Sequence, residues 1–152
     1  MDIEEQYDKI YRFCFWKVHN RELAEDLTQE TFLRYLSNPH DKQGKEMQYL
    51  YTIARNLCID EWRRMEDSSD PEGEISDNGA ASDAMDYMVQ INQILDKLSS
   101  EDREILILRF VNEEPLTSIC KVTGLSRFAL YRRINSIKKE IQNIWQGGIQ
   151  SE

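Results

Sequence analysis

The chain has 152 residues, enough for one domain or two small ones, and its 28 acidic and 19 basic residues give a net charge of −9. A net negative charge by itself argues against a nucleic-acid-binding protein. The charge is unevenly distributed, however, because residues 66–88 contain eight acids and no base, whereas residues 121–145 contain six bases and one acid. We therefore expect an acidic connecting segment and a basic carboxyl-terminal part with a charge suited to binding nucleic acid.

The three cysteines, Cys14, Cys58 and Cys120, are far apart in the sequence, and neither a CxxC pair nor a metal-ligand spacing of histidines accompanies them. We interpret them as small, reduced core residues of a cytoplasmic protein. The start Met-Asp-Ile-Glu-Glu predicts no signal peptide, and no apolar run is long enough to cross a bilayer. The sequence has no P-loop, glycine-rich phosphate loop or nucleophile elbow, so no catalytic residue, cofactor, metal or small-molecule substrate is expected.

Two helices are predicted at the amino-terminal end. Apolar residues recur at helical spacing over Ile3–Val18, and residues 24–36 contain neither glycine nor proline. Asn20 is the expected N-cap of the second helix, because its side chain can accept a hydrogen bond from the first turn. One face of this helix carries Asp26, Gln29, Glu30 and Leu33. An ordinary amphipathic helix with a solvated acidic face is the alternative interpretation.

A loop is predicted at residues 37–46 and a third helix at residues 47–65. The expected buried stripe of this helix consists of Leu50, Ile53, Ala54 and Leu57. The other faces carry Tyr49, Thr52, Arg55, Asn56, Asp60, Trp62 and Arg63. Aromatic rings can stack on bases, an asparagine can pair with a base edge and an arginine can bind phosphate, so the exposed side of this helix is a candidate nucleic-acid surface.

The carboxyl-terminal part, residues 89–145, is predicted to be a second helical domain. Ser99 is the expected N-cap of one of its helices, and Pro115 suits the start of another. Residues 116–139 fit a helix-turn-helix, because Gly124 lies where a turn needs a positive φ and Ser126 can cap the helix that follows. The expected buried stripe of that helix is Leu130, Ile134 and Ile137, and its opposite side is basic. The pattern favours a recognition helix in a major groove, with a basic solvated helix as the alternative.

Two longer motifs connect these elements to a known family. The run Glu-Asp-Leu-Thr-Gln-Glu-Thr-Phe-Leu at residues 25–33 resembles the core-binding helix of bacterial RNA polymerase sigma factors, specifically the extracytoplasmic-function type (group IV of the sigma-70 family). Residues 49–64 are similar to the helix of these proteins that reads the minus-ten promoter element. The resemblance implies an all-α fold with a region 2-like domain at residues 1–65, an acidic flexible linker at 66–88, a region 4-like helix-turn-helix domain at 89–146 and a flexible tail at 147–152.

The resemblance also implies sites and partners. Core polymerase would be bound by Asp26, Gln29, Glu30, Leu33 and Arg34. The opened minus-ten strand would be held by Lys42, Tyr49, Thr52, Arg55, Asn56, Asp60 and Arg63. The minus-thirty-five duplex would be read by Ser126, Arg127, Tyr131, Arg132, Arg133, Asn135 and Lys138. The implied partners are core RNA polymerase, promoter DNA and an anti-sigma factor in the bacterial cytoplasm, and the implied function is transcription initiation at specific promoters.

The sequence departs from the family pattern in the recognition helix. Phe128 replaces a usual small residue, Ala129 stands where a threonine is frequent, and Ser136 stands where an arginine is common. The alternative function is a helix-turn-helix regulator that recruits polymerase without replacing sigma, with a sensor or dimerisation domain in the amino-terminal half. The acceptor cluster at residues 26–30 and the set Tyr49, Asn56 and Trp62 argue against that alternative, because a sensor domain needs neither.

Overall fold

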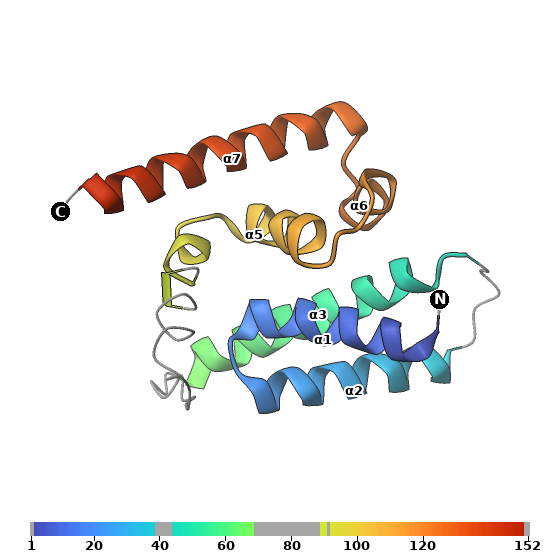
Figure 1. The fold of residues 1–152 in the computed structure, drawn as a ribbon. Coiled ribbons are helices and arrows are strands. Elements are labelled where there is room, and N and C mark those ends of the chain that lie inside the picture. Colours follow the sequence, from blue (N-terminus) through green and yellow to red (C-terminus); the bar gives the residue numbers. More distant parts are fainter. Residues whose placement is uncertain (1, 39–43, 69–88, 91, 151–152) are drawn as a thin grey trace. The chain divides into compact units, whose positions relative to one another are not determined.

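The computed structural model describes residues 2–38, 44–68, 89–90 and 92–150 (Figure 1). The chain divides into two compact units, Met1–Asp77 and Asn78–Glu152. All regular elements in the described part are helices, so the all-α prediction is confirmed. None of the described helices has the length and apolar character needed to cross a membrane. Lys42 and residues 69–88 of the predicted linker lie outside the described residues.

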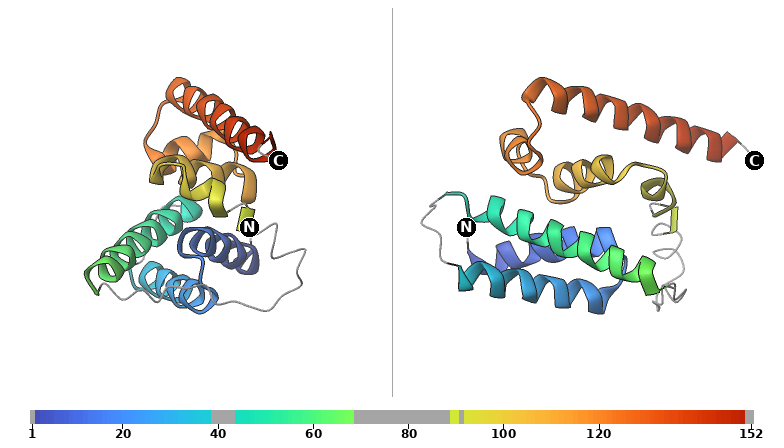
Figure 2. Two further views of the ribbon diagram at one scale, coloured as in Figure 1. Left: turned by 90° about the vertical axis from the view of Figure 1, so that its left-hand side faces the viewer. Right: turned by 180° about the vertical axis from the view of Figure 1, so that it is seen from behind.

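The first unit is a bundle of three helices, α1 (Ile3–Val18), α2 (Arg21–Ser37) and α3 (Glu46–Ser68), each of which contacts the other two (Figures 1 and 2). Its core combines apolar side chains from all three helices: Ile10, Phe13, Cys14, Ala24, Leu27, Leu50, Tyr51, Ala54, Leu57 and Cys58. The predicted bounds of α1 are confirmed at both ends.

The turn between α1 and α2 is held by backbone and side-chain caps. His19 adopts a left-handed conformation, with φ of 56°, and its N–H donates to the Phe15 carbonyl at 2.7 Å. The Asn20 side chain accepts from the Leu23 N–H at 2.9 Å, which confirms the predicted N-cap. Each cap satisfies a backbone group that the end of a helix would otherwise leave unpaired. The two helices can therefore run antiparallel with only two residues between them.

The buried side of α2 contains two threonines as well as apolar residues. Thr28 and Thr31 are fully buried, and their hydroxyls donate to the carbonyls of Ala24 and Leu27 at 2.6 and 2.7 Å. These bonds satisfy the hydroxyls inside the helix, so burying them leaves no donor unpaired. The packed side of α2 is therefore fixed, and it faces away from the side that carries the predicted acceptors.

The second unit contains α5 (Ser100–Leu106), a π-helical turn η1 (Ile107–Val111), α6 (Leu116–Thr123) and α7 (Arg127–Gln150). The helix α7 packs against both α5 and α6, and α6 also contacts η1. The apolar core of this unit consists of Leu95, Leu98, Ile105, Ile107, Leu108, Ile119, Val122, Leu130, Ile134 and Ile137. The predicted buried stripe of α7 is therefore confirmed.

The helix-turn-helix prediction is confirmed by the geometry between α6 and α7. Gly124 has φ of 82°, and its N–H donates to the Cys120 carbonyl at 2.8 Å, which ends α6. The Ser126 hydroxyl accepts from the Ala129 N–H at 3.1 Å and begins α7. A residue with a Cβ would be strained at this φ, so glycine allows the sharp change of direction. Ser99 likewise accepts from the Asp102 N–H at 3.1 Å and caps α5, as predicted.

The helix ends differ from the sequence analysis in three places. The helix α3 continues through residues 66–68, which were assigned to the linker, and α7 continues through residues 147–150, which were assigned to the tail. The helix that Ser99 caps changes after Leu106 to the π-helical turn η1, where the Asn112 N–H donates to the Ile107 carbonyl at 3.0 Å, a change that the sequence pattern does not indicate. Cys120 is half-buried, whereas Cys14 and Cys58 lie in the core.

Candidate polymerase and nucleic-acid interfaces

The exposed side of α2 brings together the residues predicted to bind polymerase. Asp26, Gln29 and Arg34 are exposed, Glu30 is half-buried, and Arg34 Nε donates to Glu30 Oε2 at 3.0 Å. Leu33 is 61% exposed in the middle of these polar groups. Leu36 was not among the predicted polymerase-binding residues. It is 67% exposed and lies one turn after Leu33 on the same face of α2. We call these residues the α2 surface: Asp26, Gln29, Glu30, Leu33, Arg34 and Leu36.

Two leucines on the solvent side of a capped, well-packed helix need an explanation. Ala24 and Leu27 of α2 are buried in the bundle and Phe32 stacks on Tyr7 of α1, whereas Leu33 and Leu36 are exposed and lie outside this packing. An apolar pair surrounded by charged side chains is typical of a protein interface, in which the apolar centre is desolvated and the polar rim sets specificity. The α2 surface therefore has the composition of a docking site.

Apart from Lys42, which lies outside the described residues, the predicted minus-ten residues lie on α3. Asn56, Asp60 and Arg63 are exposed, whereas Tyr49, Thr52 and Arg55 are half-buried. Within this set, the Thr52 hydroxyl donates to the Gln48 carbonyl at 2.9 Å. Arg64, beside Arg63 in the sequence, donates to Glu61 at 2.7 Å, and this contact raises the pKa of Arg64 above its ordinary value. We call Tyr49, Thr52, Arg55, Asn56, Asp60 and Arg63 the α3 surface.

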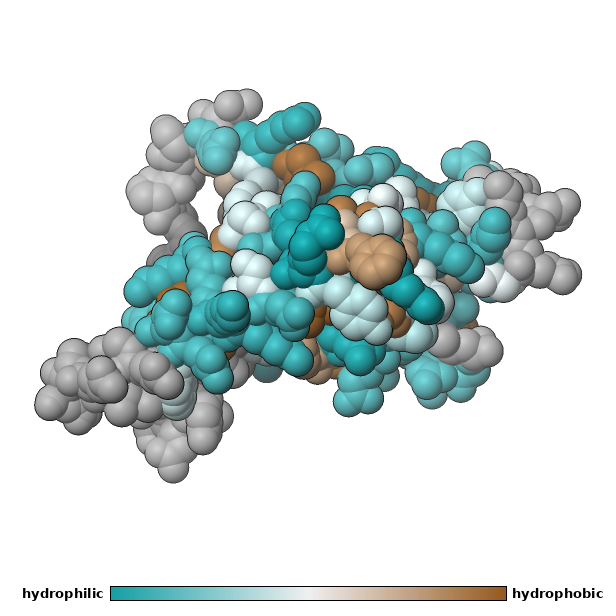
Figure 3. Space-filling view, turned by 90° about the horizontal axis from the view of Figure 1, so that it is seen from above, coloured by the Kyte–Doolittle hydropathy of each residue, from teal (hydrophilic) through white to brown (hydrophobic). Residues whose placement is uncertain are grey.

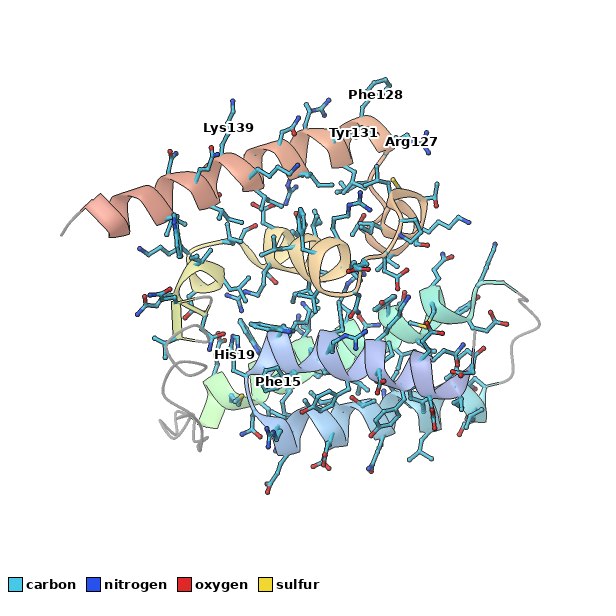
Figure 4. All side chains as sticks on the ribbon, viewed as in Figure 1. Phe15, His19, Arg127, Phe128, Tyr131 and Lys139 are labelled. Carbon is cyan, nitrogen blue, oxygen red and sulfur yellow. The ribbon has the colours of Figure 1, made fainter. Side chains whose placement is uncertain are left out.

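The helix α7 exposes most of the predicted minus-thirty-five residues. Ser126, Arg127, Arg132, Asn135 and Lys138 are exposed, and Tyr131 is 50% exposed. Figure 4 shows Arg127 at the start of α7 and Lys139 further along the helix. Seen from above α7, hydrophilic side chains surround small apolar areas (Figure 3). This side of α7 therefore presents cations and hydrogen-bonding groups together.

Arg133 is the exception among the predicted contacts. Its Nε donates to Asp102 Oδ1 and its Nη2 to Glu101 Oε1, both at 2.9 Å. These two bonds, the one to Glu101 first, raise the pKa of Arg133 above its ordinary value. The guanidinium thus ties α7 to the amino-terminal turn of α5 inside the second unit. We assign Arg133 a structural role and leave it out of the DNA contacts.

One pair of residues escaped the sequence analysis because its members are far apart in the chain. Cys14 of α1 and Cys58 of α3 meet in the core of the first unit, and their contact, together with burial, raises the pKa of Cys14 well above its ordinary value. A thiol held in its protonated form is a poor nucleophile. The pair therefore packs the bundle and has no features of a reactive site.

The cysteines should consequently differ in reactivity. We expect a thiol reagent to modify half-buried Cys120 first, and Cys14 and Cys58 only after unfolding, as followed by mass spectrometry of the native protein. Because the unfolded chain would release the Cys14 proton near the ordinary thiol pKa of about 8.5, the free energy of unfolding should fall as the pH rises above that value. Modification of Cys14 at the rate of Cys120 would contradict this assignment.

The fold and these surfaces define a class: a two-unit helical protein with an exposed apolar pair on α2 and a helix-turn-helix. Comparisons with known proteins agree. Residues 3–67 match the family model for sigma-70 region 2. The chain is 26% identical to the ECF RNA polymerase sigma factor SigW of Bacillus subtilis, over 94% of this chain and 89% of the relative. It is 27% identical to SigM of the same organism, over the full length of both chains.

A solved structure shows the same fold. The sigma factor RpoE of Bartonella quintana, in complex with the anti-sigma factor NepR, superposes with a TM-score of 0.66 and 19% identity, over 93% of this chain and 92% of the other. Residues 3–67 thus match sigma-70 region 2, and the chain over nearly its whole length is similar to extracytoplasmic-function (ECF) sigma factors. These similarities support a factor for transcription initiation.

Proposed function

We propose that this chain is a sigma factor that binds core RNA polymerase through the α2 surface and directs it to promoters that α3 and α7 read. The observation that carries the proposal is the exposure of Leu33 and Leu36 beside Asp26 and Gln29, on a helix inside the segment that matches sigma-70 region 2. An anchor of two leucines with a charged rim suits a protein partner and not a nucleic acid. The names of the relatives refer to RNA polymerase, which supports polymerase as the partner of this surface.

The α3 surface would capture the opened minus-ten strand. Asn56 can pair with the edge of an extruded base, and Arg63 can bind a phosphate on the same side of the helix. Holding a base outside the duplex costs a few kcal/mol, which contacts of this kind have to offset. Tyr49, two turns before Asn56 on the same side of α3, would offer its half-buried ring for a neighbouring base to stack on.

The helix α7 would read the minus-thirty-five duplex in the major groove. Residues at its amino-terminal end, Ser126, Arg127 and Tyr131, would approach base edges, and Lys138 would bind phosphate further along. The two DNA sites would gain affinity from being held together on polymerase, because tethering raises their effective concentration. The free protein, with its net charge of −9, should then bind promoter DNA weakly.

An anti-sigma factor is the other partner we propose, because the structural neighbour is a complex of a sigma factor with one. A protein that covered Leu33 and Leu36 would remove the polymerase docking site. Such a partner should therefore compete with core polymerase for this chain.

The proposed function is tested by mixing the chain with bacterial core polymerase that lacks sigma, and adding the DNA upstream of the chain's own gene. We expect a defined run-off transcript that depends on the chain. Stable promoter binding without core polymerase, together with no transcript in its presence, would favour the alternative of a regulator that does not replace sigma.

Within the same assay, Asn56→Ala should lower the run-off yield roughly tenfold, since one bidentate base contact contributes about 1–3 kcal/mol. Because Asn56 is exposed, the variant should bind core polymerase as well as the unaltered chain does. A template with a pre-opened minus-ten region separates strand capture from melting. Arg64→Ala is the control, since its guanidinium is paired with Glu61, and an equal loss in both variants would contradict the assignment of Asn56.

A further inference from the structure

Phe128 stands out on the surface of the second unit. Its side chain is 77% exposed, more than any other large apolar side chain in the described part of the chain. It is the second residue of α7, one turn before Tyr131 and Arg132, and the helix start is fixed by the Ser126 cap on the Ala129 N–H. Figure 4 shows Phe128 and Lys139 projecting from α7 toward solvent. The apolar core of the unit uses Leu130, Ile134 and Ile137 instead, so the Phe128 ring has no part in packing.

The side chains around Phe128 indicate what covers it. Positions 128, 132, 135 and 139 follow one another at helical spacing, so the ring begins a row that continues with Arg132, Asn135 and Lys139. Arg127 and Tyr131, one turn apart, flank this row. The row therefore has an apolar ring at the first turn of the helix and the two cations, Arg132 and Lys139, behind it. This arrangement matches a helix that enters a major groove with its amino-terminal end first and places its cations on phosphates.

An apolar side chain has one specific target in the major groove. The thymine C5-methyl is the apolar group that a base pair presents there, and phenylalanine is among the side chains that contact it. A contact between the ring and the methyl group removes apolar surface of both partners from water, which favours binding, whereas a ring that stays in water contributes nothing to the binding free energy.

We infer that Phe128 is a specificity-determining residue that selects a thymine in the minus-thirty-five element by contact with its C5-methyl group. The inference rests on the proposed function and adds to it a base preference that the arginines of α7 do not supply. The ring acts by contact with the base, whereas the cations of the row act on any sequence.

The test isolates the methyl group. Holoenzyme formed from core polymerase and the full chain is used to select duplexes from a library with randomised base pairs upstream of a pre-opened minus-ten region. In the enriched duplex, each thymine is then replaced in turn by uracil, which lacks the C5-methyl and pairs in the same way. We expect one replacement to weaken retention roughly fourfold, the ratio that corresponds to burial of one methyl at about 0.8 kcal/mol.

The same duplexes are then measured with variants. Phe128→Ala should bind the thymine duplex as weakly as the unaltered chain binds the uracil duplex, and should be insensitive to the replacement. Phe110→Ala removes another exposed phenylalanine of this unit, on η1. This variant should still lose retention when the thymine is replaced by uracil, to the same extent as the unaltered chain. Unchanged melting temperatures of both variants would show that the fold is retained, as the exposure of both rings predicts.

The outcomes separate the inference from the proposed function. An enriched duplex with no uracil-sensitive position, or one whose sensitivity persists in Phe128→Ala, would overturn the inference and leave the promoter-reading function intact. Failure to enrich any sequence, although the holoenzyme forms, would overturn both. A methyl effect that disappears only in Phe128→Ala would establish the contact.

Discussion

Replacing Leu33 by aspartate is expected to weaken the binding of core polymerase roughly a hundredfold, because the substitution removes an apolar anchor and puts a charge into a desolvated interface. Leu33 is 61% exposed and is not part of the core, so the first unit of the variant should fold as it does in the unaltered chain. Affinity is measured by the fluorescence anisotropy of labelled chain titrated with core polymerase, and folding by the thermal transition in circular dichroism.

The matched control is Ile3→Asp. Ile3 is 62% exposed and lies on α1 of the same unit, so this variant introduces the same charge at the same exposure, away from the α2 surface. We expect it to bind polymerase normally. Equal losses of polymerase affinity in the two variants would mean that the added charge acts on the chain in general. Normal binding by Leu33→Asp would show that the α2 surface does not bind polymerase.

Replacing Arg133 by alanine is expected to lower the free energy of unfolding of the second unit by about 1–3 kcal/mol, the range for hydrogen bonds that involve charged groups. The substitution leaves the half-buried Asp102 carboxylate without the guanidinium that bonds it at 2.9 Å. Because Glu101 is largely exposed, its contact should contribute the smaller part. Urea unfolding, monitored on the helical signal, measures the change.

Arg132→Ala is the comparison, since Arg132 is the neighbouring arginine and is exposed. This variant should keep the stability of the unaltered chain, but lower promoter binding by the holoenzyme and reduce the slope of log affinity against log salt by about one. Under conditions where it stays folded, Arg133→Ala should keep that slope. A reduced slope for Arg133→Ala would place its guanidinium on a phosphate and contradict the structural role.

Local signals were sufficient for α1, for the start of α2 and for the turn in the second unit. Both ends of α1, the Asn20 and Ser126 caps and the positive φ at Gly124 depend on interactions within a few residues, which the sequence displays directly. The end of α3 was misplaced because residues 66–68 are polar, and polarity alone does not distinguish a solvated last turn from a linker.

The wrong or missing assignments in the core share another cause. Tyr51 was not placed in the buried stripe of α3, yet it is 1% exposed and meets Phe13 of α1 edge to face, with ring centroids 5.2 Å apart. A helix that packs against two others buries a wider arc than a single stripe, and which residues fill that arc depends on its neighbours. The contact between Cys14 and Cys58 has the same origin.

The sequence by itself determined the resemblance to extracytoplasmic-function sigma factors, the helical elements with most of their caps, and the residue types available on α2, α3 and α7, because periodicity, capping and motif spacing are local. The tertiary structure decided which of those residues are available to a partner. It left Leu33, Leu36 and Phe128 exposed and turned Arg133 inward to Glu101 and Asp102. The physical reason is that exposure and pairing depend on residues distant in the chain, here 31 and 32 positions away for Arg133.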